Sequence, residues 1–99
     1  MKYKVITSTQ YNRDVVKLAR ALKDHSNMAK RIFQELERKL DGLEDNPFAY
    51  PVFRESKYRR VNLEDNALFY TVDETRREVK LYHLYYAKRD IDKLLGIDR

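Results

Sequence analysis

Residues 66–89 read NALFYTVDETRREVKLYHLYYAKR, and the rest of the fold follows from this stretch. Residues 67–72 and 79–86 form two runs rich in aromatic and β-branched side chains, which suit a pleated, packed surface. The polar segment between them predicts a turn, so the two runs are expected to pair as an antiparallel hairpin. We expect this hairpin to form the centre of a sheet, with the other elements packed on or beside it.

The chain before this hairpin predicts a short strand and two amphipathic helices. The strand is expected at residues 2–7, and Ser8 or Thr9 can cap the helix that follows it. Apolar residues then recur at helical spacing on both sides of a polar break at residues 24–27. The two stripes are Tyr11, Val15, Leu18 and Leu22, and then Ala29, Ile32, Phe33, Leu36, Leu40 and Leu43.

The ends of the second helix carry recognisable signals. Ser26 or Asn27 can cap its start, and Gly42 suits the left-handed position that follows a helix end. Because the link between the helices is short, they should form an antiparallel pair. Their apolar stripes need a partner, and the sheet is the one available.

The remaining elements complete one domain over residues 1–99. A long irregular connection is expected at residues 44–56, a strand at 57–63 and a short helix at 91–95, which Asp90 caps and Gly96 ends. The predicted order is β-α-α-β-β-β-α. The predicted fold class is α+β, with a small antiparallel-dominated sheet and a helical hairpin packed on one face.

Composition restricts the compartment and the partners. The 99 residues carry 21 Lys and Arg against 16 Asp and Glu, a net charge of +5, and they contain no cysteine. Residues 1–30 hold no apolar segment long enough for a signal peptide or a membrane span. We therefore expect a cytoplasmic protein without a membrane partner. The basic balance favours acidic partners such as nucleic acid or an acidic protein, although interleaved charges are also typical of a plain solvated surface.

Several kinds of chemistry find no support in the sequence. The two glycines are far apart, so no glycine-rich loop is available to hold a phosphate. Neither His25 nor His83 has carboxylates at a spacing that completes a metal site, and thiolate ligands are impossible. We expect no metal and no small-molecule cofactor.

A set of cations and aromatic rings remains as the candidate site. Alternation along residues 79–86 predicts that His83 and Tyr85 share a face with Val79 and Leu81, and that Lys80, Tyr82, Leu84 and Tyr86 share the other. A face that the helices leave open would offer groups suited to binding phosphate or stacking on a base. Packing with satisfied hydroxyl groups is the alternative explanation for the tyrosines. The cations of this set are Arg59, Arg60, Lys88 and Arg89.

Taken in order, the motifs of this chain resemble those of the RelE/ParE toxin superfamily, over nearly the whole sequence. The residues that carry the resemblance are Asn46-Pro47 with Tyr50-Pro51, YRRV at 58–61, LFYTVDE at 68–74, YAKRDI at 86–91 and Leu94-Leu95. The resemblance implies a RelE/ParE-like fold and the toxin half of a bacterial type II toxin–antitoxin pair. It also implies a cognate antitoxin that wraps the toxin with a helix-forming segment.

The superfamily includes a RelE-like branch, which cuts mRNA in the ribosome with the 2′-hydroxyl as nucleophile. Such cleavage needs a proton acceptor, cations around the phosphate and an acid for the leaving oxygen. By resemblance, Arg59 and Arg89 fall at basic positions of this branch, and Tyr86 or His83 would replace its late tyrosine. That tyrosine would fall near Leu94 or Leu95, and Ala67 stands where the branch usually has an arginine.

The ParE-like branch binds DNA gyrase and needs no set of RNA-cleaving residues. The missing arginine at Ala67 and the sequence of segment 86–90 therefore agree better with this branch than with the RelE-like one. We therefore predict a toxin that inhibits DNA gyrase and arrests growth. Ribosome-dependent mRNA cleavage is the alternative, with Arg59, Tyr86 and Arg89 as its catalytic set, so enzymatic activity is left open. A non-toxic basic nucleic-acid-binding module is the third hypothesis. The predicted target-binding residues are Arg59, Arg60, Tyr86, Lys88 and Arg89.

Overall fold

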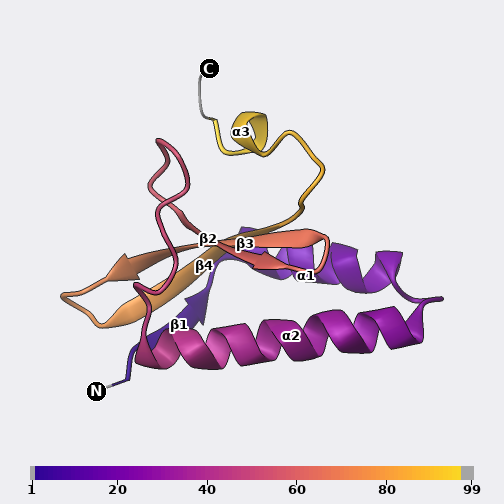
Figure 1. The fold of residues 1–99 in the computed structure, drawn as a ribbon, viewed down its shortest axis with the longest axis horizontal. Helices are drawn as coiled ribbons and strands as arrows, with labels where there is room; N and C mark the ends of the chain where they lie inside the picture. The colour runs from indigo at the N-terminus through magenta and orange to yellow at the C-terminus, as the bar shows by residue number, and fades with distance from the viewer. Residues whose placement is uncertain (1, 97–99) are drawn as a thin grey trace.

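The computed structural model describes residues 2–96, and its element order is the predicted one (Figure 1). No helix in this part of the chain is long and apolar enough to cross a membrane. The elements are β1 (Lys4–Thr7), α1 (Thr9–Ala21), α2 (Ser26–Asp45), β2 (Arg59–Leu63), β3 (Asn66–Asp73), β4 (Glu78–Tyr86) and α3 (Ile91–Leu94).

The four strands form one sheet in the order β1-β4-β3-β2, so the predicted hairpin of β3 and β4 lies at its centre. β1 pairs with β4 in parallel, and the other neighbours are antiparallel. α1 and α2 cover one face of the sheet, which we call the helix side (Figure 1). The segment 46–58 and α3 reach the opposite face, which we call the open side.

The main core lies between the sheet and the two helices. Burial of these apolar side chains is the chief force that holds the helical hairpin on the sheet. The start of α1 is also tied to the middle of β4, because the Ser8 hydroxyl caps α1 at the Tyr11 N–H and donates to the Tyr82 carbonyl. The buried members of the main core are Tyr11, Leu36, Leu43, Val61, Leu63, Leu68, Tyr70, Val79, Leu81 and Leu84.

A smaller core lies on the open side. Ala67 and Phe69 of β3 are fully buried there, beneath Ile91 at the start of α3. The Phe53 and Phe69 rings pack edge to face, with ring centroids 5.4 Å apart. Arg54 pairs with the buried carboxylate of Asp92, which ties the segment 46–58 to α3. The predicted long connection thus folds back onto the sheet.

Strict alternation along β4 was a wrong prediction, because the strand contains a β-bulge. Phe69 pairs with His83 while Tyr70 pairs with Leu81, so Tyr82 is an extra residue in the β4 ladder. Such a bulge shifts the side chains that follow it by one position. Leu84 therefore joins the helix-side core, and His83 joins the open side.

Two predictions about α2 were also wrong. The residue before its first turn is His25, which makes no side-chain capping bond, and Ser26 is already helical. Gly42 does not end the helix, because its carbonyl accepts the N–H of Asn46 and the helix continues to Asp45. The extra turn buries Leu43 completely. Burial of a leucine stabilises by about 1.5–3 kcal/mol, which exceeds the roughly 1 kcal/mol cost of a helical glycine.

We expect the substitution Gly42→Ala to stabilise the protein by about 0.5–1 kcal/mol, because alanine restricts the unfolded chain and suits a helix. Apart from its chain neighbours and the backbone of its own helix, a Cβ atom at position 42 would meet no atom of the described residues within 4 Å. Urea unfolding of both proteins measures the difference. Gly96→Ala is the matched contrast: position 96 has φ of 74°, where alanine is strained, so that variant should be destabilised. Loss of stability in Gly42→Ala would contradict the account.

Candidate functional site

Cations and aromatic rings gather on the open side of the sheet, in a surface that we call the cationic–aromatic face. The bulge contributes to it directly, since it places Tyr82, His83 and Tyr85 of β4 on the same side. Tyr58, from just before β2, packs against Tyr82 and His83 with centroid distances of 5.3 Å to each ring. The face comprises Lys57, Tyr58, Arg60, Lys80, Tyr82, His83 and Tyr85.

The cations of this face lie over aromatic rings. The Lys57 and Lys80 ammonium groups are 5.5 Å and 5.2 Å from the centroid of the Tyr82 ring. The Arg60 guanidinium lies 5.1 Å from the Phe53 centroid. These distances are typical of cation–π attraction. Each cation is therefore held near the sheet while it keeps its charge.

His83 and Tyr85 form a hydrogen-bonded pair within the face. The Tyr85 hydroxyl lies 2.8 Å from His83 Nδ1, and the two rings stack with centroids 4.9 Å apart. Burial lowers the pKa of His83, and Lys57 lowers it further, while Asp14 acts in the opposite direction. Burial also raises the pKa of Tyr85. At neutral pH the pair is therefore an uncharged imidazole beside an uncharged phenol.

We expect an NMR titration to give His83 a midpoint below the ordinary value of 6.5. The unfolded chain binds this proton more readily than the folded one, so His83 reduces stability as pH falls through about 6.5. Urea unfolding at pH 7 and pH 5 should therefore show a smaller loss of stability in His83→Gln than in the wild type. A midpoint at or above 6.5 would show that the imidazole is not held neutral.

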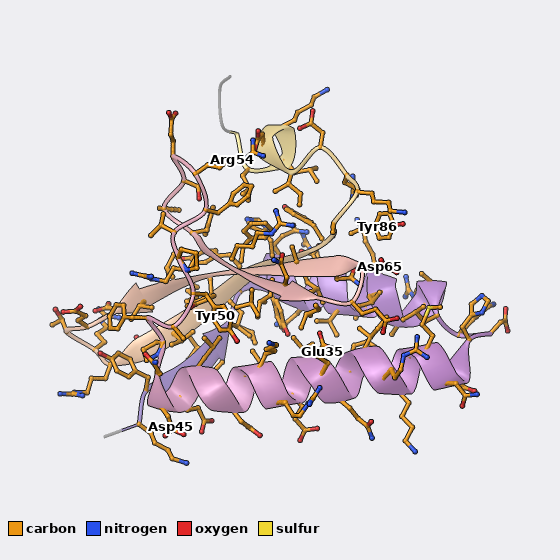
Figure 2. All side chains as sticks on the ribbon, viewed as in Figure 1. Glu35, Asp45, Tyr50, Arg54, Asp65 and Tyr86 are labelled. Carbon is orange, nitrogen blue, oxygen red and sulfur yellow. The ribbon has the colours of Figure 1, made fainter. Side chains whose placement is uncertain are left out.

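Arg59 lies on the helix side, away from the cationic–aromatic face. Its guanidinium donates to the Tyr50 carbonyl at 2.7 Å and lies 5.0 Å from the centroid of the Phe48 ring. Figure 2 shows Tyr50 between the sheet and α2, whereas Arg54 lies on the opposite side of the sheet. Arg59 therefore holds the segment 46–58 in place. The prediction of one surface shared by Arg59 and Arg60 was wrong.

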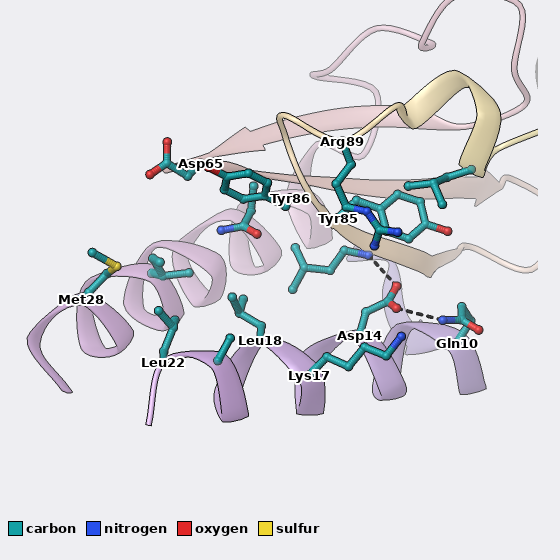
Figure 3. A pocket seen from close by; sticks show the side chains of 15 residues that line it. Gln10, Asp14, Lys17, Leu18, Leu22, Met28, Asp65, Tyr85, Tyr86 and Arg89 are labelled. Atoms are coloured by element: carbon teal, nitrogen blue, oxygen red, sulfur yellow. Dashed lines mark hydrogen bonds between the residues drawn. The ribbon is translucent and has the colours of Figure 1, made fainter. Parts of the chain in front are cut away.

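Tyr86 and Arg89 line a recess of about 560 Å³, which we call the α1–β4 groove (Figure 3). Its walls come from α1, the start of α2, the turn between β2 and β3, the end of β4, and the segment from Arg89 to α3. Tyr86 is 46% exposed, so much of its ring faces solvent. The apolar lining suits the side chains of a partner protein better than a phosphate. The apolar lining residues are Leu18, Ala21, Leu22, Met28, Ile32, Leu84 and Leu94.

A buried carboxylate supports one wall of this groove. Asp14 Oδ2 accepts the N–H of Leu84 at 3.0 Å, and its Oδ1 accepts the side-chain amide of Gln10 at 2.8 Å (Figure 3). β1 ends at Thr7, so this part of the β4 edge has no strand beside it. Asp14 satisfies a backbone donor that the missing strand would otherwise bind.

The predicted target-binding residues thus lie in four places. Arg59 supports the segment 46–58, Arg60 belongs to the cationic–aromatic face, and Tyr86 and Arg89 line the groove. Lys88 is exposed in the turn before α3. The predicted ribonuclease set of Arg59, Tyr86 and Arg89 does not converge on one point. Within residues 2–96, no group of His, Cys, Asp or Glu side chains is placed to hold a metal ion.

Sequence reasoning missed Lys57 and Asp14. Lys57 carries no motif, since a lone lysine before a strand is typical of a solvated surface. Asp14 has one signal, a carboxylate within the apolar stripe of α1, one residue before Val15. A carboxylate at such a position is unusual unless it has a buried partner.

Comparison with known proteins decides the family. The sequence profile described as the ParE toxin of the type II toxin–antitoxin system parDE matches residues 5–91. The chain belongs to the ParE toxin family. This confirms the resemblance to the RelE/ParE superfamily and establishes the ParE family member as the toxin of a type II toxin–antitoxin system.

Solved structures agree on the fold of this ParE family member. It is similar to a chain of the toxin–antitoxin complex RelBE2 from Mycobacterium tuberculosis, with a TM-score of 0.63 and 21% sequence identity. The match covers 87% of this chain and 99% of that chain. A comparison with the curated proteins finds no match. The α+β fold with its four-stranded sheet is thus confirmed as RelE/ParE-like.

Proposed function

We propose that this toxin arrests growth by inhibiting DNA gyrase, and that it acts by binding rather than by cutting RNA. The observation that carries the proposal is the packing at Ala67, where the resemblance places an arginine of the RNA-cleaving branch. Ala67 is fully buried against Ile91 and the small core on the open side. An arginine at this position would have to displace that packing to reach a phosphate, and this supports binding over cleavage.

The proposed partners also include a cognate antitoxin. The family description pairs the toxin with an antitoxin, and the similar RelBE2 chain was solved in a toxin–antitoxin complex. The net charge of +5 favours an acidic antitoxin. Toxicity should therefore disappear when an acidic antitoxin from the neighbouring gene is produced with the toxin.

A supercoiling assay with purified proteins tests the gyrase proposal. Toxin added to gyrase and relaxed plasmid should block supercoiling and should accumulate cleaved plasmid after detergent and protease treatment. The same toxin added to translating ribosomes should leave the mRNA intact. Unaffected supercoiling together with cut mRNA would overturn the proposal.

The predicted target-binding residues remain part of the proposal, and alanine variants of Arg59, Arg60 and Arg89 test them one at a time. We expect at least one of the three to abolish growth arrest while the protein stays folded by circular dichroism. Arg60→Ala and Arg89→Ala are the informative variants, since Arg59→Ala also releases the segment 46–58 from its contacts. Full toxicity of all three would show that the target binds elsewhere.

Ribosome-dependent mRNA cleavage is the second candidate, and the His83–Tyr85 pair favours it. A neutral imidazole can accept the proton of a 2′-hydroxyl, and Lys57 supplies a nearby cation. If this chemistry occurs, His83→Gln should reduce mRNA cleavage at least a hundredfold, and Tyr85→Phe should reduce it less. Growth arrest by His83→Gln at the wild-type level would exclude this candidate.

A further inference from the structure

The cationic–aromatic face has the composition of a nucleic-acid site, and this holds whichever protein the toxin inhibits. Its rings come from two separate parts of the chain, residue 58 and residues 82–85. Tyr82 is only half-buried, so part of its ring is accessible from solvent. Base stacking on such a ring is tolerant of sequence, because every base has a π-face.

In the part of the chain that the structure describes, no carboxylate forms an ion pair with the cations around Tyr82. Within residues 2–96 the carboxylate ion pairs are Lys2–Glu44, Arg31–Glu64 and Arg54–Asp92, and none of them includes Lys57, Arg60 or Lys80. Burial lowers the pKa of Arg60, and the charge of Arg54 lowers it further, so a second positive charge acts on Arg60. An anion placed at this face would therefore be attracted by several charges at once.

Two lysines lie beside the one ring that would stack on a base. Lys57 and Lys80 flank one ring at 5.5 Å and 5.2 Å, and long lysine side chains can turn toward a phosphate while a base takes their place on the ring. His83 and Tyr58 pack beside that ring and hold it in position. Arg60 lies on the same face and extends the positive surface toward β2.

We propose that the cationic–aromatic face binds single-stranded nucleic acid, with a base stacked on Tyr82 and the flanking phosphates held by Lys57 and Lys80. Duplex DNA is a poor ligand for this arrangement, because its bases are already stacked on one another. The proposal is independent of the gyrase proposal, since it concerns the toxin alone.

Fluorescence anisotropy with labelled 12-nucleotide strands tests the proposal on the full chain. The probes are oligo(dT), oligo(rU) and a 12-base-pair duplex, each at 50 and 200 mM salt, without gyrase or ribosomes. We expect both single strands to bind more tightly than the duplex, with affinity that falls as salt rises. The ratio of the dT and rU affinities then identifies DNA or RNA as the preferred ligand.

Matched variants distinguish binding at the cationic–aromatic face from non-specific electrostatic attraction to the whole protein. Lys57→Ala with Lys80→Ala should weaken single-strand binding at least tenfold. Lys23→Ala with Lys30→Ala removes the same charge from exposed positions, one in the turn between α1 and α2 and one on α2, and should weaken it less than threefold. Tyr82→Leu should weaken it about tenfold, whereas Tyr82→Phe should keep most of the affinity.

Three results would overturn the proposal: no binding at 50 mM salt, duplex binding as tight as single-strand binding, or equal losses in the two lysine pairs. Circular dichroism of each variant checks that the fold is intact. Because the assay contains no gyrase, failure here leaves the gyrase proposal standing, and failure of the supercoiling assay leaves this one standing.

Discussion

Leu43→Ala should lower the free energy of unfolding by about 2–5 kcal/mol, because it leaves a cavity in the main core. Leu43 is completely buried in the last turns of α2, in the helix-side cluster with Val61 and Tyr70. A domain of this size has a total stability of roughly 5–15 kcal/mol. The variant should therefore lose a large part of its stability, and its toxicity at 37 °C should fall with the amount of folded protein.

Urea unfolding followed by circular dichroism measures this effect, with Glu37→Ala as the control. Glu37 is exposed on the same helix, so its replacement should change stability by less than about 0.5 kcal/mol. A loss below about 1 kcal/mol in Leu43→Ala would mean that the end of α2 does not pack on the sheet as described.

Asp14→Ala should destabilise the protein by about 1–3 kcal/mol, because it leaves the Leu84 N–H buried without an acceptor. Asp14 is 6% exposed and has no cationic partner among the ion pairs of residues 2–96, so its main contribution is these hydrogen bonds. Asp14→Asn keeps an oxygen that can accept from Leu84, and it should cost less than the alanine variant.

Amide hydrogen exchange at Leu84 provides a local measurement of the same effect. Exchange at this amide should be faster in Asp14→Ala than in the wild type, while the β3–β4 ladder near Val72 should change only with the global stability. Equal stability of Asp14→Ala and the wild type, with Leu84 still protected, would show that another group satisfies this donor.

The fold could be predicted because local patterns and global packing agree in most of the chain. The aromatic runs of β3 and β4, the helical stripes of α1 and α2, and the caps at Ser8 and Asp90 all appear where they were expected. The parallel placement of β1 beside β4 depends on packing between distant segments. No local signal fixed that placement.

The bulge at Tyr82 could not be predicted, and it explains why the predicted faces of β4 were wrong. Nothing in residues 79–86 distinguishes a bulged strand from a regular one, since both are rich in aromatic and branched residues. The bulged residue has a contact from a distant segment, since the Ser8 hydroxyl donates to the Tyr82 carbonyl. Tertiary contacts of this kind override the alternation of an isolated strand.

The placement of Arg59 and Arg60 on opposite faces of the sheet could be predicted from the sequence. Alternation along β2 places Arg59 with Val61 on one face and Arg60 on the other, as observed. The positions of Tyr86 and Arg89 in the α1–β4 groove could not be predicted from the sequence, because the groove forms only where β4 extends beyond the end of β1. The side chains of that groove come from α1, α2, the β2–β3 turn, the end of β4 and the segment from Arg89 to α3, which lie far apart in the sequence.

Detection of trapped gyrase in cells tests the central claim most directly. The toxin is induced alone in a bacterium, and DNA covalently bound to gyrase and ribosome-bound transcripts are both sampled within minutes. The account predicts gyrase-linked DNA breaks with intact transcripts. Transcripts cut on ribosomes, with no increase in gyrase-linked breaks, would contradict it.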